Sequence, residues 1–317
     1  MRRIRLSPAL IAIAVLVAAC GPTQAEQPGG GELGGGKLVI AVQPTATPET
    51  LSADAKELRE YLSQRLGREV EIIFPTTYAG VVEALRFGHA QAAFMSAWPA
   101  SLAVKLAGAE LPLAEIREVV IGQEKKEEPF YFSYWVVRKD SPVTKLADLR
   151  GRRAALTSAL STSGYVAPVA RMVELGLITS APGKEADPKT FFSEVALPGG
   201  YQQAWEALRS GQVDVSVIAG DVSEKLYREV LDNTRVIEQQ GPIPSHAVLF
   251  AKDLAPADRT KLKDALLSLN AAERRPLMRK FVSGIFVGFK ETTAKEHLAA
   301  LDRYLDLTQL AFVERLK

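Results

Sequence analysis

Apolar, strand-like runs alternate with amphipathic, helix-like stretches along most of this chain, and this alternation constrains the fold more than any other feature. Residues 37–42 are continuous in apolar side chains, as in a buried strand. Residues 51–66 carry an apolar helical face that ends at Gly67, and further strands are predicted at 69–74 and 92–95. Strands separated by helices in this way indicate a mostly parallel sheet with helices on both faces.

A second series of alternating elements follows the β-prone run at residues 130–138. In total about 280 residues carry the pattern, which is more than one compact core normally organises. The predicted fold class is therefore α/β, with two lobes joined by two crossing strands and a ligand cleft at the carboxyl ends of the strands. We assign residues 37–138 and 244–317 to lobe 1, and residues 139–243 to lobe 2.

The N-terminus has the features of an export signal. A basic start is followed by an apolar run that is short for a membrane span, which is typical of a cleaved signal peptide over residues 1–19. Small residues directly precede Cys20, the only cysteine, and resemble the bacterial lipobox, in which this Cys becomes lipidated. A nucleophile or a buried apolar residue is the alternative for a lone Cys. Residues 20–36, rich in Gly and Pro, are predicted to form a flexible tether.

Charge and residue content argue against several classes of function. Signal cleavage removes three of the 39 basic residues and none of the 37 acidic ones, so the mature chain is close to neutral and a nucleic-acid partner is not expected. The three histidines have no metal-ligand spacing, and no glycine motif for nucleotides is present. We therefore expect no metal, no cofactor and no enzymatic activity. Ser163 could act as a nucleophile only if His246 met it across the cleft.

The segment Ser161-Thr162-Ser163-Gly164 directly precedes a helical stretch. The first backbone N–H groups of a helix lack partners within it and carry partial positive charge. Hydroxyls at this end add donors, and Gly164 lets an oxyanion approach the backbone closely. The segment predicts a site for a small tetrahedral or carboxylate anion. An ordinary Ser/Thr helix cap is the alternative.

A similar unit occurs once in each lobe. Residues 78–88 and 201–211 both begin with Tyr, continue through Glu-Ala-Leu-Arg, end at Gly and run into an apolar strand. Tyr78 and Tyr201 either pack as half-buried residues or face one cleft from opposite lobes. The hydroxyl segment between them in the sequence favours the second interpretation.

Several motifs together carry a family resemblance. Besides the lipobox and the repeated helix end, they are Ala-Phe-Met-Ser at 93–96, the strand that includes Tyr131, Leu-Ala-Asp-Leu-Arg-Gly at 146–151, Ser-Thr-Ser-Gly-Tyr-x-x-Pro at 161–168, Gly-Gln-Val-Asp at 211–214 and Ile243-Pro244. From Lys37 to Leu254 the chain resembles the phosphate/phosphite/phosphonate-binding proteins of ABC importers, the PhnD-like family. The motif at 161–168 is the specific one.

The resemblance implies a type II periplasmic binding protein, whose two α/β lobes close on a ligand about two crossing strands. It implies that Ser161, Thr162 and Ser163 hold the oxygens of a small phosphorus oxyanion. Tyr78 and Tyr131 match family tyrosines that donate to, or pack on, the oxyanion from the first lobe. The partners it implies are an ABC permease with its ATPase, and we expect the chain to be a monomer.

The chain departs from the family pattern around the expected ligand. Where the family usually has a Tyr, this chain has Ser96 and Trp98, either of which can occupy the space. A His is common where Tyr201 starts its helix, and an acidic residue is frequent at the position of His246. Asp221 is either the partner of a ligand ammonium group or a helix cap. These departures predict a ligand simpler than an aminoalkyl phosphonate, or a different oxyanion.

Two functions are compatible with the sequence. The first is a lipid-anchored receptor that delivers a small oxyanion to an ABC permease. The alternative is a sensor lipoprotein of the same fold that presents the bound anion to a membrane histidine kinase. Both place an exported, anchored protein in a periplasm or on the outer surface of the cell.

Overall fold

A computed structural model describes residues 36–121 and 124–311 of the chain. The predicted signal peptide, Cys20 and all but the last residue of the predicted tether lie outside the described residues. Within the described ranges, no helix combines the length and the apolar character needed to cross a bilayer.

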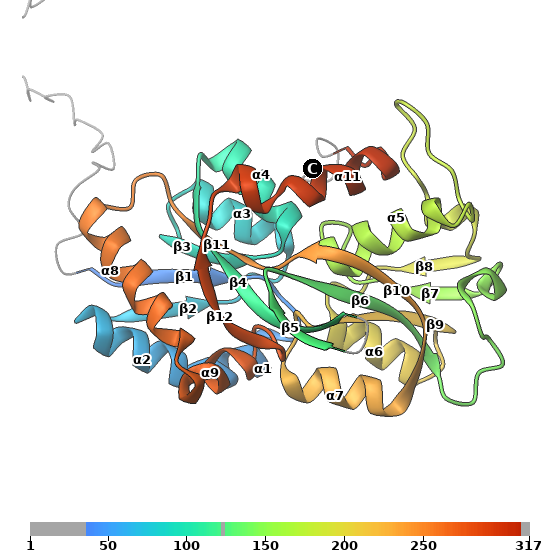
Figure 1. The fold of residues 1–317 in the computed structure, drawn as a ribbon, viewed down its shortest axis with the longest axis horizontal. Helices are drawn as coiled ribbons and strands as arrows, with labels where there is room; N and C mark the ends of the chain where they lie inside the picture. Colours follow the sequence, from blue (N-terminus) through green and yellow to red (C-terminus); the bar gives the residue numbers. More distant parts are fainter. Residues whose placement is uncertain (1–35, 122–123, 312–317) are drawn as a thin grey trace, which may run out of the picture. The chain divides into compact units, whose positions relative to one another are not determined.

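The first sheet has seven strands among the described residues, in the order β12-β4-β11-β3-β1-β2, with β5 paired to β4 outside this path (Figure 1). β1 pairs in parallel with β2 and β3, whereas β11, β12 and β5 are antiparallel to their neighbours. Within this sheet, the predicted parallel arrangement is therefore confined to the three N-terminal strands. The bounds are β1 Leu38–Val42, β2 Val70–Ile73, β3 Ala92–Met95, β4 Glu110–Ile121, β5 Glu124–Glu128, β11 Ala247–Phe250 and β12 Phe286–Glu291.

The second sheet has the order β10-β6-β9-β7-β8. β7 is parallel to β8 and β9, while β6 is antiparallel to β9 and β10. β6, which the sequence analysis placed in lobe 1, thus pairs within the sheet of lobe 2. The bounds are β6 Phe130–Arg138, β7 Arg153–Ala155, β8 Glu194–Ala196, β9 Val215–Ala219 and β10 Thr234–Pro244.

Helices cover both faces of the first sheet, and alternate side chains of β1 show why. Ile40 and Val42 pack in the core with α2 and α8, whereas Ala41 packs in the core with α3 and α4. α5, α6 and α7 accompany the second sheet (Figure 1). The α-helices are α1 Pro48–Asp54, α2 Lys56–Leu66, α3 Tyr78–Arg86, α4 Ala97–Ala107, α5 Ala167–Glu174, α6 Tyr201–Arg209, α7 Glu224–Asn233, α8 Pro256–Leu267, α9 Arg275–Arg279, α10 Ala294–His297 and α11 Ala299–Thr308.

The chain passes between the two sheets more than once. It leaves the first sheet after the β4–β5 hairpin to enter β6, and it returns from β10 to β11. These are the two crossing strands that the fold class requires. A further crossing leads from β12 to α11, which packs beside α5 and β10 (Figure 1). There Ser180 Oγ donates to the Leu307 carbonyl at 2.6 Å, and Tyr304 donates to the Pro242 carbonyl at 2.7 Å.

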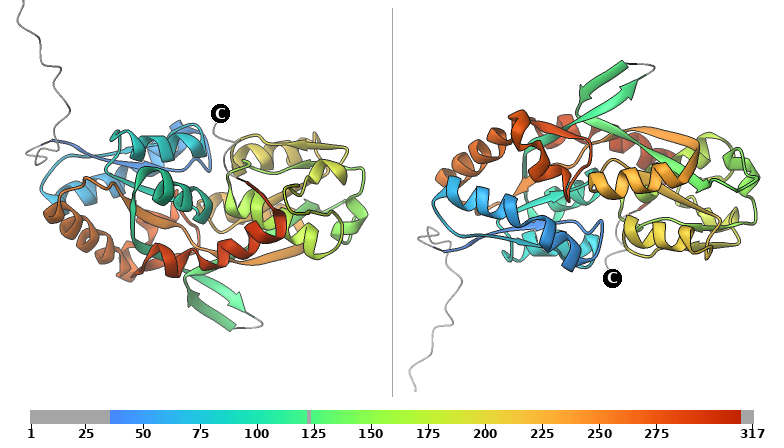
Figure 2. Two further views of the ribbon diagram at one scale, coloured as in Figure 1. Left: turned by 90° about the horizontal axis from the view of Figure 1, so that it is seen from above. Right: turned by 90° about the horizontal axis from the view of Figure 1, so that it is seen from below.

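The charged run at 124–128 forms strand β5. It forms an antiparallel hairpin with β4 that projects from the rest of the protein (Figure 2). Because its residues are charged on both faces, neither an alternating nor a continuous apolar pattern marks it as a strand. The strand is instead defined by its backbone hydrogen bonds to β4.

Candidate functional site

The hydroxyl segment opens the helix after β7, as predicted, and begins with one π turn that continues as α5. Ser161 is the N-cap, since its Oγ accepts from the Gly164 N–H at 3.0 Å. Thr162 Oγ1 accepts from the backbone N–H of Trp98 at 2.8 Å. These two hydroxyl oxygens therefore accept hydrogen bonds from backbone N–H groups of the protein itself. Ser163 differs, because its hydroxyl bonds side chains from other elements.

Gly164 is required by close packing in this segment. A Cβ at this position would lie 2.0 Å from Thr157 Oγ1 and 2.8 Å from Thr157 Cγ2. The Thr157 N–H also donates to the Gly164 carbonyl at 3.2 Å, so the loop after β7 is fixed against the start of the helix. The glycine thus keeps the helix start close to the strand end.

Ser163 lies at the centre of a group of buried polar side chains. Its Oγ donates to Asp221 Oδ2 at 2.6 Å and accepts from the Tyr201 hydroxyl at 2.8 Å. The Tyr131 hydroxyl donates to the same Asp221 oxygen at 3.0 Å. We call Tyr131, Ser163, Tyr201, Asp221 and His246 the cleft residues. Each is at most 1% exposed, so the site is closed to solvent in this structure.

The two repeated helices bring their tyrosines to the same segment. Tyr78 starts α3, behind the Thr77 cap, and its hydroxyl lies 3.5 Å from Ser161 Oγ. Tyr201 starts α6 and reaches Ser163. Burial and the Asp221 carboxylate raise the pKa of Tyr78, Tyr131 and Tyr201. All three hydroxyls therefore stay protonated and can donate hydrogen bonds.

Asp221 lies in the turn between β9 and α7, and it is not the helix cap. Ser223 caps α7 by accepting from the Leu226 N–H, so that alternative is wrong. Burial raises the pKa of Asp221, but His246, Arg117 and the Ser163 hydroxyl outweigh burial and hold it below its usual value. Asp221 is therefore a buried carboxylate in the cleft.

His246 precedes β11 and faces residues from three other elements. Its Nε2 lies 2.9 Å from Gln43 Nε2 and 3.4 Å from Asp221 Oδ2, and its Nδ1 lies 3.6 Å from Glu115 Oε1. Gln43 Oε1 accepts from the Ser96 N–H at 2.6 Å, which fixes the orientation of the Gln43 amide. The Gln43 NH₂ group is then left to donate to His246.

Behind His246 lies an ion pair that sequence reasoning missed. Arg117 Nε and Nη2 donate to Glu115 Oε2 at 3.0 and 2.8 Å, and both side chains are fully buried in β4. The Arg117 guanidinium also lies 4.0 Å from the centre of the Tyr131 ring. Breaking such a buried pair costs about 3–5 kcal/mol, because the remaining charge has no partner.

The structure places the altered stretch around Trp98 next to the same site. The Ser96 backbone is tied to Gln43, while its buried Oγ has no hydrogen-bond partner among the described residues. Trp98 contributes its backbone N–H to Thr162, and its side chain is buried in the core. All ten predicted ligand residues therefore gather around one buried site, with Ser96 Oγ and the cleft residues as its polar groups.

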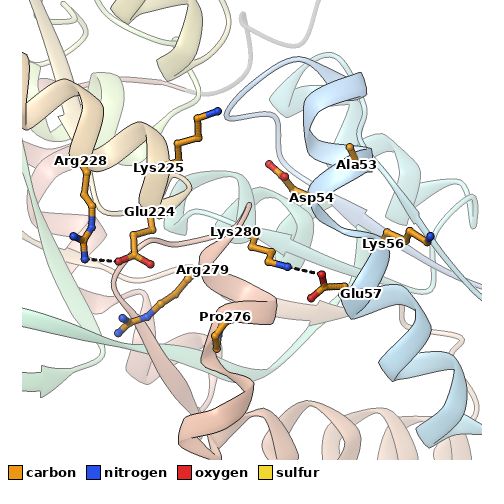
Figure 3. A pocket seen from close by; sticks show the side chains of 10 residues that line it. All are labelled: Ala53, Asp54, Lys56, Glu57, Glu224, Lys225, Arg228, Pro276, Arg279 and Lys280. Carbon is orange, nitrogen blue, oxygen red and sulfur yellow. Dashed lines mark hydrogen bonds and ion pairs between the residues drawn. The ribbon is translucent and has the colours of Figure 1, made fainter.

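An open hollow elsewhere on the protein has a different character (Figure 3). It measures about 670 Å³, and α1, α2, α7 and α9 line it. Its charges are mixed, and four of them form two ion pairs, Lys280 with Glu57 and Arg228 with Glu224. None of the predicted ligand residues lines it.

Comparisons with known proteins bear on the family and the fold of the chain. A family model for the periplasmic substrate-binding protein of phosphonate ABC transporters matches residues 40–297. The phosphate-import protein PhnD of Mycolicibacterium smegmatis is 27% identical over 212 residues, which cover 66% of this chain and 63% of that protein. The matched part of the chain thus spans a little less than two thirds of this relative.

Two solved structures share the fold. A binding protein component of an ABC phosphonate transporter from Pseudomonas aeruginosa superposes with a TM-score of 0.71 at 20% identity, covering 88% of this chain and 91% of its own. PhnD1 from Prochlorococcus marinus, in complex with methylphosphonate, gives a TM-score of 0.68 at 14% identity, covering 85% and 97%. The type II periplasmic binding protein fold is thereby confirmed. Because the family model matches well over half of the chain, the protein belongs to the periplasmic substrate-binding proteins of phosphonate ABC transporters, a family of binding proteins and not of enzymes.

Proposed function

We propose that this protein captures a small phosphorus oxyanion between its lobes and delivers it to an ABC permease, while lipidated Cys20 anchors it to the membrane. The observation that carries the proposal is that Tyr131 and Ser163 donate to one buried carboxylate beside the start of a helix, while Tyr201 donates to Ser163. Hydroxyl donors and a helix start can hold an oxyanion without a full opposite charge. The ten predicted ligand residues are proposed to line this site.

Asp221 favours oxyanions that carry a proton. Its Oδ2 already accepts from Tyr131 and Ser163, whereas its buried Oδ1 has no partner among the described residues. A carboxylate oxygen can only accept hydrogen bonds, so a ligand beside it must supply the donor. The P–OH group of a phosphate, phosphite or methylphosphonate monoanion can do so. Fully ionised sulfate cannot, and its charge would be repelled.

The environment of Asp221 also supports a simple ligand over an aminoalkyl phosphonate. His246 Nε2 lies 3.4 Å from Asp221 Oδ2. His246 thus faces the carboxylate that would otherwise pair with the ammonium group of an aminoalkyl phosphonate. The relatives support the same class of ligand: one is named a phosphate importer, and another was solved with methylphosphonate. We therefore propose phosphite, phosphate or methylphosphonate as the class of ligand.

A thermal-shift panel tests the proposal. A ligand that binds only the folded protein must stabilise it, so phosphite, phosphate or methylphosphonate should raise the Tm while sulfate should not. A clear shift with some other compound, and none with any phosphorus oxyanion, would refute the assignment. Cell fractionation of a Cys20→Ser variant tests the anchor, since we expect loss of membrane association. Unchanged membrane association of this variant would contradict lipidation.

A further inference from the structure

The buried charges around the cleft do not balance when His246 is neutral. Asp221 and Glu115 carry two negative charges and Arg117 carries one positive charge, and each of these residues is fully buried. A site with one excess negative charge in a medium of low polarity opposes the entry of an anion. If the protein binds oxyanions as proposed above, the site needs a further source of positive charge.

His246 is placed to supply that charge, because its Nε2 has two partners of opposite kind. Gln43 Nε2, at 2.9 Å, is an amide donor, so Nε2 accepts from it when the imidazole is neutral. Asp221 Oδ2, at 3.4 Å, is an acceptor, so Nε2 can bond to it only when protonated. On the other side of the ring, Nδ1 faces Glu115 Oε1 at 3.6 Å.

We propose that His246 is a specificity-determining residue of the oxyanion site, which takes up a proton at Nε2 as the anion binds, and that Glu115, held by Arg117, is its positioning residue. Proton uptake breaks the hydrogen bond that Nε2 accepts from Gln43 and lets Nε2 donate to Asp221. The added positive charge balances the excess negative charge of Asp221, Glu115 and Arg117. The Gln43 amide, released from His246, is then a further donor beside the ligand. Affinity for a phosphorus oxyanion therefore rises as the pH falls through the titration of His246.

The groups that face His246 support this direction. Glu115 and Arg117 approach from β4 and Asp221 from the turn after β9, while Gln43 after β1 is neutral. Burial and Arg117 lower the pKa of His246, but Glu115 and Asp221 outweigh them and hold it above its ordinary value. The imidazole is therefore charged below this raised pKa and neutral above it, so the stabilising charge is lost as the pH rises.

Nuclear magnetic resonance of the protein without ligand tests the role of Glu115. The sequence has only three histidines, so ¹⁵N-labelled imidazole signals can be assigned with His246→Gln and followed against pH. We expect wild-type His246 to titrate above pH 6.5, and Glu115→Gln to lower its pKa by about one unit or more. Glu118→Gln is the matched control, because Glu118 lies on the same strand but pairs with exposed Lys125. A wild-type His246 that titrates at or below 6.5 overturns the proposal, even if Glu115→Gln does not fold.

Calorimetric titration with methylphosphonate tests the link to binding. The ionisation of methylphosphonate cancels in the ratio of Kd values for His246→Gln and the wild type. We expect this ratio to fall from roughly tenfold or more at pH 5.5 to near one at pH 9, since one lost charge-assisted hydrogen bond is worth about 1.5–3 kcal/mol. A ratio that does not change with pH refutes proton-linked binding. If no phosphorus oxyanion binds, the proposed function fails, whereas the ligand-free titration still reports separately on Glu115.

Discussion

Ser163 Oγ donates to Asp221 Oδ2 across 2.6 Å, so the hydroxyl best placed to hold an oxyanion is bonded to a carboxylate of the protein itself. Both side chains are fully buried. A ligand that uses Ser163 must therefore take over this hydrogen bond, and Asp221 must find a new donor. The relationship links the two residues in binding, and the predictions for Ser163 and Asp221 follow from it.

Ser163→Ala is expected to weaken binding of methylphosphonate, and it also lowers stability, because the buried Asp221 carboxylate and Tyr201 hydroxyl each lose a hydrogen-bond partner. A hydrogen bond to a charged group is worth about 1.5–3 kcal/mol, or roughly 10- to 150-fold in Kd. Calorimetric titration measures the loss, with Ser210→Ala at the exposed end of α6 as the control. Unchanged affinity would assign the segment to helix capping alone.

Ser161→Ala is expected to lower the free energy of unfolding with a smaller loss of affinity than Ser163→Ala, because Ser161 Oγ caps the Gly164 N–H and does not bond Asp221. Loss of a helix cap costs about 0.5–2 kcal/mol. Guanidinium unfolding measures the loss of stability, and calorimetric titration of both variants measures the loss of affinity. Equal losses of affinity in the two variants would contradict the division of roles.

Asp221→Asn is expected to shift selectivity towards sulfate. The amide removes the charge that repels a fully ionised anion and adds a donor, so the ratio of sulfate to methylphosphonate affinity should rise by about tenfold or more. Competition titrations with the two anions measure the ratio. A ratio equal to that of the wild type would show that Asp221 does not select for oxyanions that carry a proton.

Gly164→Ala is expected to destabilise the protein, because the new Cβ would lie 2.0 Å from Thr157 Oγ1. Overpacking of this kind costs about 1–3 kcal/mol. Thr157→Ala removes the two nearest atoms that clash and leaves Ser161 Oγ at 2.9 Å, so the double variant should recover much of the stability. Chemical unfolding of the two single variants and the double variant forms a complete cycle. Additive losses would mean that the contact is not the cause.

His297 is expected to destabilise the fold as the pH falls. It is buried, with Nε2 2.9 Å from the Ser245 carbonyl, and burial lowers its pKa to about 4. Below an ordinary pKa of about 6.5 the unfolded chain takes up a proton that the folded chain refuses until about pH 4. This difference in proton uptake lowers the free energy of unfolding by about 3 kcal/mol as the pH falls from about 6.5 to about 4.

Unfolding of wild type and His297→Gln between pH 7.5 and 4 measures this contribution of His297. The other groups, including His246 with its opposite sign, cancel in the difference between the two proteins. His89→Gln is the control, because His89 is exposed. A difference in stability that stays constant with pH would contradict the depressed pKa.

Much of the fold could be predicted because its elements carry local signals. β3 and α6 have the predicted bounds, since an apolar run or an apolar helical face between glycines defines each of them. The long strand β4 had no such signal. Its charged residues Glu115 and Arg117 interrupt the apolar pattern, and their burial depends on partners that only the tertiary structure brings together.

The site could be predicted only in part for the same reason. Ser163, Tyr131 and Tyr201 stand in motifs, so the sequence marks them. Gln43 was missed, although its position directly after β1 is the carboxyl end of a strand, where such sheets bind ligands. Glu115 offered no comparable signal, because a charged residue within a strand ordinarily indicates a face in solvent.

Helix α11 bears on the mechanics of ligand release. Because Ser180 and Pro242 on the side of the second sheet bond to it, the chain is fixed there a third time, beyond the two crossing strands. Separation of the lobes must therefore either carry this helix along or detach it from α5. We expect the free energy of that detachment to contribute to the barrier for ligand release, and so to lower the rate at which the closed protein releases its ligand. We therefore expect α11 to slow a separation of the lobes whose axis lies at the two crossing strands.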